Sequence, residues 1–192
     1  LAGTKTYTDL LESTTNLLIA ATGKTSGSPA DYFTGKLYSL KITDANGDVA
    51  DFIPCKRNND GAIGVYDLVT STFHPNGSST SFTAGEEISS VILVENPIYP
   101  KSIDVLNPDW KNLPKEYEQL EYLRSSGQAY IDTGVKLNQD SAIELTFSAP
   151  LQTGGFMGSI EDSYARRFDI SGAGSHLGYA CGPGWSNGGL AV

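Results

Sequence analysis

The residue types that could do chemistry are few in this chain, and their spacing does not match a catalytic motif. Its two histidines, His74 and His176, stand far apart and belong to no nucleophile elbow or zinc-binding helix motif. The densest acidic group, Glu116, Glu118 and Glu121, would have to supply the paired carboxylates of a glycoside hydrolase. A solvated face is the favoured interpretation of such closely spaced charges. We therefore expect a protein that is not an enzyme.

A second group offers oxygen ligands for a cation. Asn58, Asn59 and Asp60 precede Gly61, and amide and carboxylate oxygens are ligands that Ca²⁺ accepts. Asn and Asp before Gly also form turns, because their side chains hydrogen-bond to the local backbone, and this interpretation is favoured. Calcium is the one cofactor that the sequence raises, with these three residues as candidate ligands and Asp162 and Asp169 as weaker ones.

Trp185 is the best candidate for contact with a sugar. It lies in the Gly-rich run GPGWSN, residues 182–187, where we expect an exposed loop. An indole ring can cover the C–H face of a sugar while Asn187 supplies an amide, and Tyr179 is a second aromatic nearby. Aromatic residues in a small sandwich pack in the core more often than they bind ligands. The candidate glycan-binding residues are thus Trp185, Asn187 and Tyr179.

Composition and charge exclude two classes of partner. The formal net charge is −9, and an acidic chain without a basic cluster is not expected to bind nucleic acid or an anionic membrane. No apolar run approaches the roughly 20 residues that span a bilayer, so we expect no membrane insertion. Cys55 and Cys181 are expected to be free thiols rather than a disulfide framework.

Turn signals and alternation predict an all-β chain. The 21 glycines and 10 tyrosines favour short strands joined by turns. Residues 33–43 alternate, with Tyr38, Leu40 and Ile42 expected on the buried face. Asn46-Gly47 predicts a hairpin, and residues 140–147 alternate again. Three prolines between residues 91 and 112 predict an extended linker.

Two runs resemble parts of one domain type. Residues 51–73, DFIPCKRNNDGAIGVYDLVTSTF, and residues 113–134, LPKEYEQLEYLRSSGQAYIDTG, resemble the laminin-G-like, concanavalin-A-like jelly-roll domains of phage structural proteins and bacterial surface proteins. In that family the second run opens the domain and the first closes it, so their order here is reversed. The resemblance implies an antiparallel β-sandwich, with residues 1–90 as a back half, 91–112 as a linker and 113–192 as a front half. Such sandwiches often bind calcium through loop residues.

Three arrangements account for the reversed order. The chain is a segment of a longer tandem array, which is the favoured interpretation, or a circularly permuted sandwich whose halves pack together, or one of several subunits that complete one another's sheets. Each half alone would expose strand edges and an apolar face, which promotes aggregation. Each half is therefore expected to need a partner.

The resemblance implies a structural or adhesive role. We expect a virion component of a phage, such as a fibre, tail or head-decoration protein, with glycan binding through loops on a rigid scaffold. Its expected partners are other virion or surface subunits, or neighbouring domains that complete the sandwich, and a host-surface glycan. A bacterial surface lectin module is the alternative, and a glycoside hydrolase on the same fold is less favoured.

Overall fold

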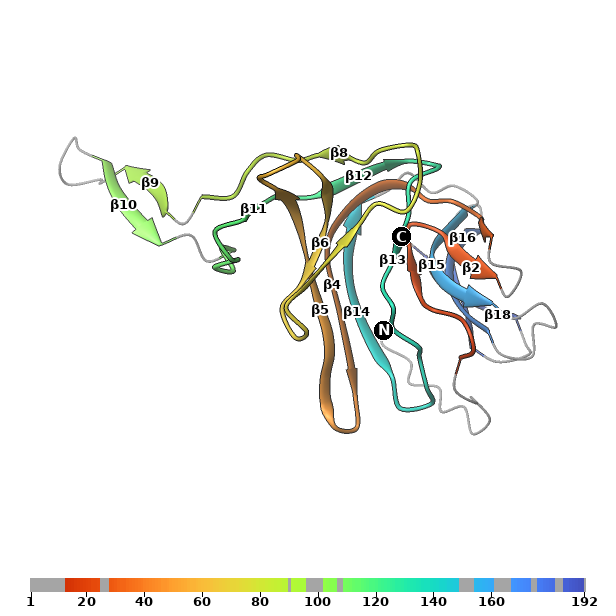
Figure 1. Cartoon of the computed structure of the whole chain (residues 1–192). Coiled ribbons are helices and arrows are strands. Elements are labelled where there is room, and N and C mark those ends of the chain that lie inside the picture. The colour runs from red at the N-terminus through yellow and green to blue at the C-terminus, as the bar shows by residue number, and fades with distance from the viewer. Residues whose placement is uncertain are drawn as a thin grey trace.

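Strands and the turns between them make up the described structure. The computed structural model describes residues 13–24, 28–89, 91–95, 102–106, 109–148, 154–160, 167–173, 176–181 and 185–191, and these ranges contain no helix. The two main sheets share one apolar core, so the chain is an all-β sandwich (Figure 1). This confirms the predicted fold class at the level of a β-sandwich.

The smaller of the two main sheets has six strands. Their order is β13-β1-β15-β16-β17-β18, and every neighbouring pair is antiparallel. The strands are β1 (Leu18–Ile19), β13 (Ile131–Asp132), β15 (Gly154–Ile160), β16 (Arg167–Ala173), β17 (His176–Cys181) and β18 (Trp185–Ala191). A short hairpin of β2 (Thr22–Lys24) and β3 (Pro29–Ala30) lies beside β15.

The larger sheet has eight strands. Its main path is β7-β6-β5-β4-β12-β8, with β11 paired to β5 and β14 paired to β4. The strands are β4 (Thr34–Asp44), β5 (Gly47–Arg57), β6 (Ile63–Asp67), β7 (Thr72–Pro75), β8 (Thr83–Ala84), β11 (Tyr117–Gln119), β12 (Leu123–Ser126) and β14 (Ala142–Ser148). The hairpin predicted at Asn46-Gly47 is confirmed, with β4 and β5 joined through Ala45 and Asn46.

Both sheets combine strands from the two sides of residues 91–112. In the larger sheet, Leu123 and Ser126 of β12 lie opposite Leu37 and Thr34 of β4. In the smaller sheet, β1 lies between β13 and β15. Several strand edges that each half would otherwise expose are therefore paired within this chain. The division of the sequence into two half-domains stays a prediction.

The segment expected as an extended linker contains a hairpin. β9 (Val91–Glu95) and β10 (Ser102–Leu106) pair along their full length, and neither belongs to the two main sheets. Figure 1 shows this hairpin standing away from the sandwich. The apolar run that begins at Val91 is thus a strand, and β10 runs antiparallel beside it.

The core lies between the sheets and draws side chains from both. Leu17, Ile19 and Met157 of the smaller sheet and its flanks meet Leu40 and Phe52 of the larger one, and all five are at most 1% exposed. The predicted alternation of residues 140–147 is confirmed: the side chains that pack against this core are Ile143, Leu145 and Phe147.

The predicted inward face of β4 is wrong at one position. Leu37, Leu40 and Ile42 are buried, whereas Tyr38 is only partly buried. The cause is a bulge, because β14 pairs Thr146 with Ser39 and the next residue, Phe147, with Leu37, so Tyr38 is skipped. One extra residue reverses the faces of a strand on its far side, and Tyr38 therefore points away from the core.

A second apolar layer covers the outer face of β5 and β6. The Tyr117 ring lies 4.9 Å from that of Tyr66 and 5.3 Å from that of Phe73, and the Arg57 guanidinium lies 4.8 Å from the Phe73 ring centre. Gly64 of β6 makes room for Phe73 here, since a Cβ at Gly64 would lie 2.9 Å from Cζ of the Phe73 ring. Gly64 is thus a close-approach position, whereas Gly61 adopts a positive φ of 70° in the predicted turn.

Cys55 is a free thiol in the part of the chain that the structure describes, and it is fully buried. Burial raises its pKa from 9.0 to about 12. Stability from the neutral thiol is therefore present below pH 9 and is lost as the pH rises through about 12. In a Cys181→Ser background we expect no alkylation of the native protein by iodoacetamide at pH 8 and rapid alkylation in denaturant. Equal rates in both conditions would contradict this placement.

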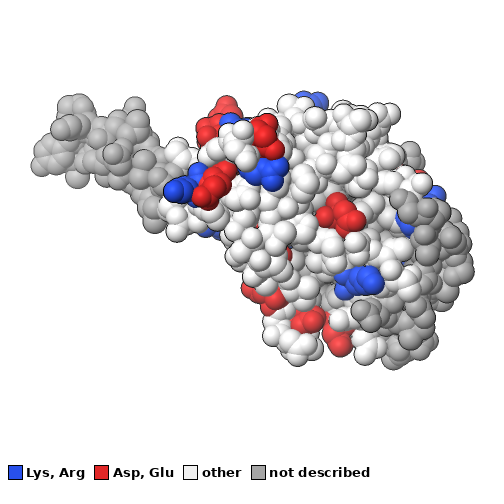
Figure 2. All heavy atoms as spheres, viewed as in Figure 1, with Lys and Arg blue, Asp and Glu red and all other residues white. Residues whose placement is uncertain are grey.

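Acidic and basic side chains are mixed on the visible surface (Figure 2). Lys41 pairs with Asp48 at 2.8 Å and Arg57 pairs with Asp60 at 2.7 Å, so these two basic groups of the larger sheet are matched by carboxylates. Within the described ranges, no helix has the length and apolarity needed to cross a bilayer.

Candidate functional site

The most distinctive feature of the larger sheet is a fork between β4 and β5. The two strands pair from Asp44 opposite Gly47 to Leu40 opposite Phe52 and then separate. Beyond that point β5 pairs with β11, with Cys55 opposite Gln119, and β4 pairs with β12, with Leu37 opposite Leu123. The segment 119–123 therefore crosses from one branch to the other.

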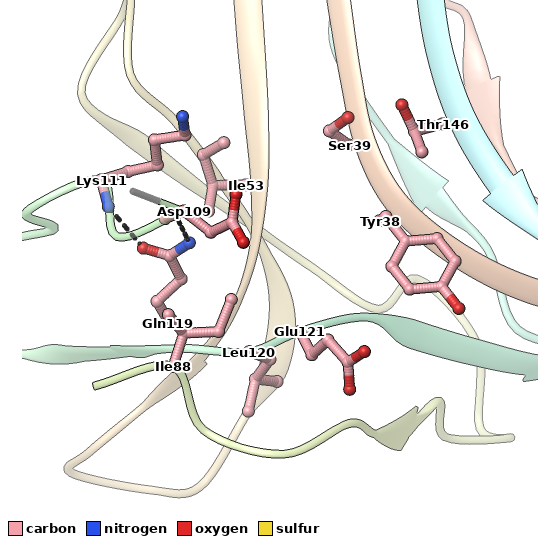
Figure 3. A pocket seen from close by; sticks show the side chains of 10 residues that line it. All are labelled: Tyr38, Ser39, Ile53, Ile88, Asp109, Lys111, Gln119, Leu120, Glu121 and Thr146. Atoms are coloured by element: carbon pink, nitrogen blue, oxygen red, sulfur yellow. Dashed lines mark hydrogen bonds between the residues drawn. The ribbon is translucent and has the colours of Figure 1, made fainter. Parts of the chain in front are cut away.

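A pocket of about 380 Å³ opens at this fork (Figure 3). It draws residues from both branches, from the crossing segment and from the connector before β11. Its lining residues are Tyr38, Ser39, Ile53, Ile88, Asp109, Lys111, Gln119, Leu120, Glu121 and Thr146.

Gln119 fixes one wall of the pocket. Its side chain is 7% exposed, and its amide Nε2 donates to the Asp109 carbonyl oxygen at 2.7 Å while its Oε1 accepts from the Lys111 backbone N–H, also at 2.7 Å. Both polar atoms of this buried amide are thus satisfied. The two bonds, drawn in Figure 3, hold the connector against the sheet and place Asp109 and Lys111 at the pocket.

The opposite wall carries an aromatic side chain set by the β-bulge. The Tyr38 ring makes an edge-on contact with the Tyr122 ring at 5.7 Å, and the Lys36 Nζ lies 3.9 Å from the centre of the Tyr122 ring. These contacts order Tyr38, which remains partly exposed. Ser39 and Thr146, which are register partners on β4 and β14, add hydroxyl groups beside it.

The acidic group at 116–121 is divided by the fold. Glu118 pairs with Lys56 at 2.5 Å, and Glu87 pairs with the same ammonium at 2.8 Å. Glu116 and Glu121 are exposed, and of these two only Glu121 lines the pocket. The three carboxylates therefore belong to different surroundings, and Glu121 shares the pocket with Asp109 rather than with its sequence neighbours.

Asp60 forms the turn through its local backbone, whereas Asn58 ties the turn to the segment before β11. The Asn58 amide donates to the Lys115 carbonyl oxygen at 3.0 Å, and Asp60 accepts from the Ala62 N–H and from the Arg57 guanidinium at 3.1 and 2.7 Å. Asn59 is exposed in the same turn. Among the described residues no group of three or more His, Cys, Asp or Glu is placed to hold a metal ion. A calcium role for Asn58, Asn59 and Asp60 stays a prediction, and it requires Asp60 to break its ion pair with Arg57.

Asp60 provides a direct test of this turn. Its hydrogen bonds from Arg57 and from the Ala62 N–H lower its pKa from 3.8 to about 2. A lowered pKa stabilises the folded state above the unfolded pKa, and that contribution is lost as the pH falls through about 2. We expect carboxyl NMR titration to show this low value, and Arg57→Ala to return it toward 3.8. An Asp60 that titrates near 3.8 in both proteins would show that the pair does not form.

The glycan candidates lie on neighbouring strands. Trp185 begins β18 rather than standing in the expected loop, and it is the register partner of Ala180 on β17. Tyr179 lies on β17 opposite Ser186, and Asn187 follows on β18. The three residues share the far edge of the smaller sheet, in a different sheet from the pocket. Their role in glycan binding stays a prediction.

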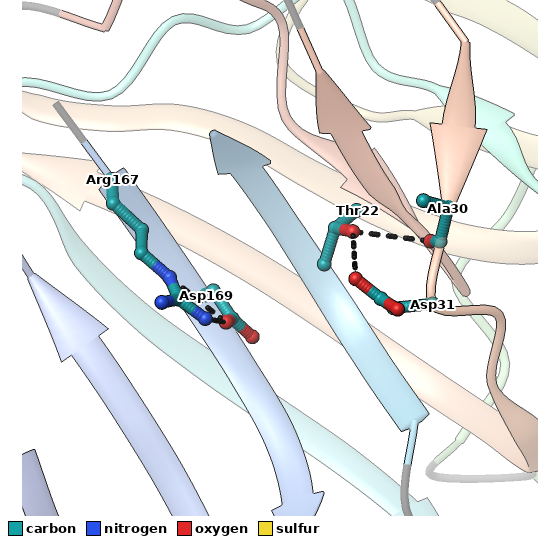
Figure 4. Close-up of polar contacts among 5 residues, drawn as sticks. All are labelled: Thr22, Ala30, Asp31, Arg167 and Asp169. Atoms are coloured by element: carbon teal, nitrogen blue, oxygen red, sulfur yellow. Dashed lines mark hydrogen bonds and ion pairs between the residues drawn. The ribbon is translucent and has the colours of Figure 1, made fainter. Parts of the chain in front are cut away.

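A partly buried ion pair lies in the smaller sheet, away from the pocket. Arg167 bonds to Asp169, which is 2% exposed, and burial raises the pKa of Asp169 although Arg167 opposes that shift (Figure 4). Nearby, the Thr22 hydroxyl oxygen lies 3.1 Å from the Ala30 carbonyl oxygen and 3.3 Å from an Asp31 carboxylate oxygen, and its single proton is shared between these two acceptors. Asp169 is thus engaged with Arg167. The other weaker calcium candidate, Asp162, lies outside the described residues.

No known protein family, curated protein or solved structure matches the chain.

Sequence reasoning missed most of the pocket. The sequence marks Glu121 only as part of an acidic run, and Gln119, Asp109 and Lys111 belong to no motif. They come together because β11 joins a branch of the sheet formed more than 60 residues earlier. The bulge at Tyr38 also could not be recognised from the alternation of residues 33–43.

Proposed function

We propose that this protein is a non-enzymatic structural or adhesive β-sandwich of a phage particle, serving as part of a fibre, tail or head decoration. The observation that carries the proposal is that strands before residue 91 and after residue 112 share both sheets. A rigid scaffold assembled from distant segments suits a particle component that presents surfaces to its neighbours.

The same pairing favours one order of the jelly-roll halves. The run that closes the resembled domain supplies most of β5, all of β6 and part of β7, and the run that opens it supplies β11, β12 and β13. β11 pairs directly with β5. A circularly permuted jelly roll, in which the opening strands follow the closing ones along the chain, accounts for this pairing without a second chain.

The adhesive part of the role is supported by the surface. The protein carries a net charge of −9, and a pocket with an aromatic ring, hydroxyls and carboxylates opens at the fork. Its proposed partners are other particle subunits and a host-surface glycan. A lectin module on a bacterial surface would use the same pocket and differs in location.

Immunogold electron microscopy separates these roles. Antibodies against the folded chain are applied to particles and to cells from a culture that encodes it. We expect label on phage particles, whereas label confined to the cell surface would favour the lectin module and overturn the virion assignment. Release of reducing ends from a polysaccharide by the wild-type protein, lost in Glu121→Gln, would overturn the non-enzymatic assignment.

A further inference from the structure

We propose that the pocket at the β4/β5 fork, lined by Tyr38, Ser39, Asp109, Glu121 and Thr146, binds one neutral hexose unit of a glycan. This inference rests on the adhesive part of the proposed function and gives it a site. The site is on the larger sheet, apart from Trp185, Asn187 and Tyr179 on the smaller one.

The pocket is built before any ligand arrives. The crossing segment bonds to both of its neighbours: the Leu120 N–H donates to the Pro54 carbonyl oxygen at 2.9 Å, and the Glu121 N–H donates to the Glu86 carbonyl oxygen at 2.8 Å. The Ile88 N–H donates to the Gln119 carbonyl oxygen at 2.9 Å. A site whose backbone is held on both sides binds without the entropic cost of ordering a loop.

The lining matches the two kinds of surface on a pyranose ring. Ile53 and Leu120 lie buried beneath the fork, with 4% and 2% of their surface exposed. Together with the Tyr38 ring they offer an apolar surface to the C–H face of a sugar. Glu121 is an exposed carboxylate that accepts hydrogen bonds from hydroxyl groups, and such charge-assisted bonds are stronger than those between neutral groups.

Charge and size narrow the ligand class. Two carboxylates against the single ammonium of Lys111 in the pocket disfavour phosphorylated, sulfated or acidic sugars. The polar rim disfavours a purely apolar ligand, whose burial would leave these groups without partners. The volume of about 380 Å³ lies near the lower end of the range for ligand sites, about 300–1,000 Å³. A single hexose residue at a chain end fits this volume better than an extended polysaccharide.

The test is an NMR titration of the full chain with free glucose, galactose, mannose and N-acetylglucosamine, preceded by a glycan array. We expect at least one neutral sugar to shift the backbone amides of Tyr38, Glu121 and Thr146. Tyr38→Ala and Glu121→Gln are each expected to weaken binding at least tenfold. Glu144→Gln is the matched control, because Glu144 is exposed on the same strand as Thr146 and does not line the pocket.

The possible results separate this site from the general role. Thermal unfolding of each variant first shows that the fold is retained. Binding that survives Tyr38→Ala and Glu121→Gln but is lost in Trp185→Ala would overturn the fork site while leaving an adhesive function in place. No binding to any neutral sugar, with particles still labelled by antibody, would overturn the fork site and leave a purely structural role.

Discussion

Leu123→Ala is expected to lower the free energy of unfolding by about 2–5 kcal/mol, the range for removing a buried leucine side chain. Leu123 is 1% exposed, lies opposite Leu37 across β12 and β4, and packs into the core shared by both sheets. Because it comes from beyond residue 112, its loss measures how far the later part of the chain stabilises the earlier part. Urea denaturation followed by tryptophan fluorescence provides the value.

A surface substitution calibrates this experiment. Val69 is 44% exposed in the turn after β6, so Val69→Ala is expected to change stability by no more than about 0.5 kcal/mol. A Leu123→Ala variant as stable as Val69→Ala would mean that β12 does not pack where the structure places it. A loss confined to one of two separate transitions would mean that the parts fold independently.

Phe52→Ala is expected to cost about 3–5 kcal/mol. Phe52 is 1% exposed at the centre of the larger sheet, where it lies opposite Leu40 and makes an edge-on contact with the His74 ring at 5.4 Å. Removing the ring leaves a cavity between the sheets that neighbouring strands cannot fill without distorting their pairing. The same denaturation experiment measures it.

Phe73→Ala is the matched control for this prediction. Phe73 is also a strand phenylalanine, but it lies on the outer layer with Tyr117 and is only partly buried. Its truncation should cost clearly less than that of Phe52. Equal losses would show that the outer layer is as important to stability as the core, and would contradict the placement of Phe52 at its centre.

Local structure was predictable where a short-range rule governs it. The Asn46-Gly47 hairpin, the turn at Gly61 and the alternation of β14 follow from positive φ and from the two-residue period of strands. The buried face of β4 could not be predicted, because the bulge at Tyr38 arises from the register of β4 with β14, about 100 residues away. The β9–β10 hairpin was not predicted, because the prolines in this segment favour an extended linker.

The pocket could not be predicted from sequence patterns, for a related reason. Its walls meet only because β4 and β5 separate and the 119–123 segment fills the gap. Gln119 has no motif around it, and its importance comes from two backbone groups at residues 109 and 111 that it binds. A pairing between distant strands leaves no local signature, so such a site is found only once the sheet is known.

The pairing of strands from the two sides of residues 91–112 has a physical consequence. Edges that each half would leave open are paired with the other half in the same chain. A permuted sandwich and an exchange of strands between subunits contain the same strand contacts and differ only in whether those contacts lie within one molecule.

An isotope-filtered NOE experiment tests this pairing most directly. A 1:1 mixture of labelled and unlabelled protein is refolded together, and backbone NOEs between residues 34–37 and 123–126 are recorded. The structure predicts these NOEs within labelled chains. Their appearance only between labelled and unlabelled chains, or their absence, would contradict a sandwich that a single chain completes.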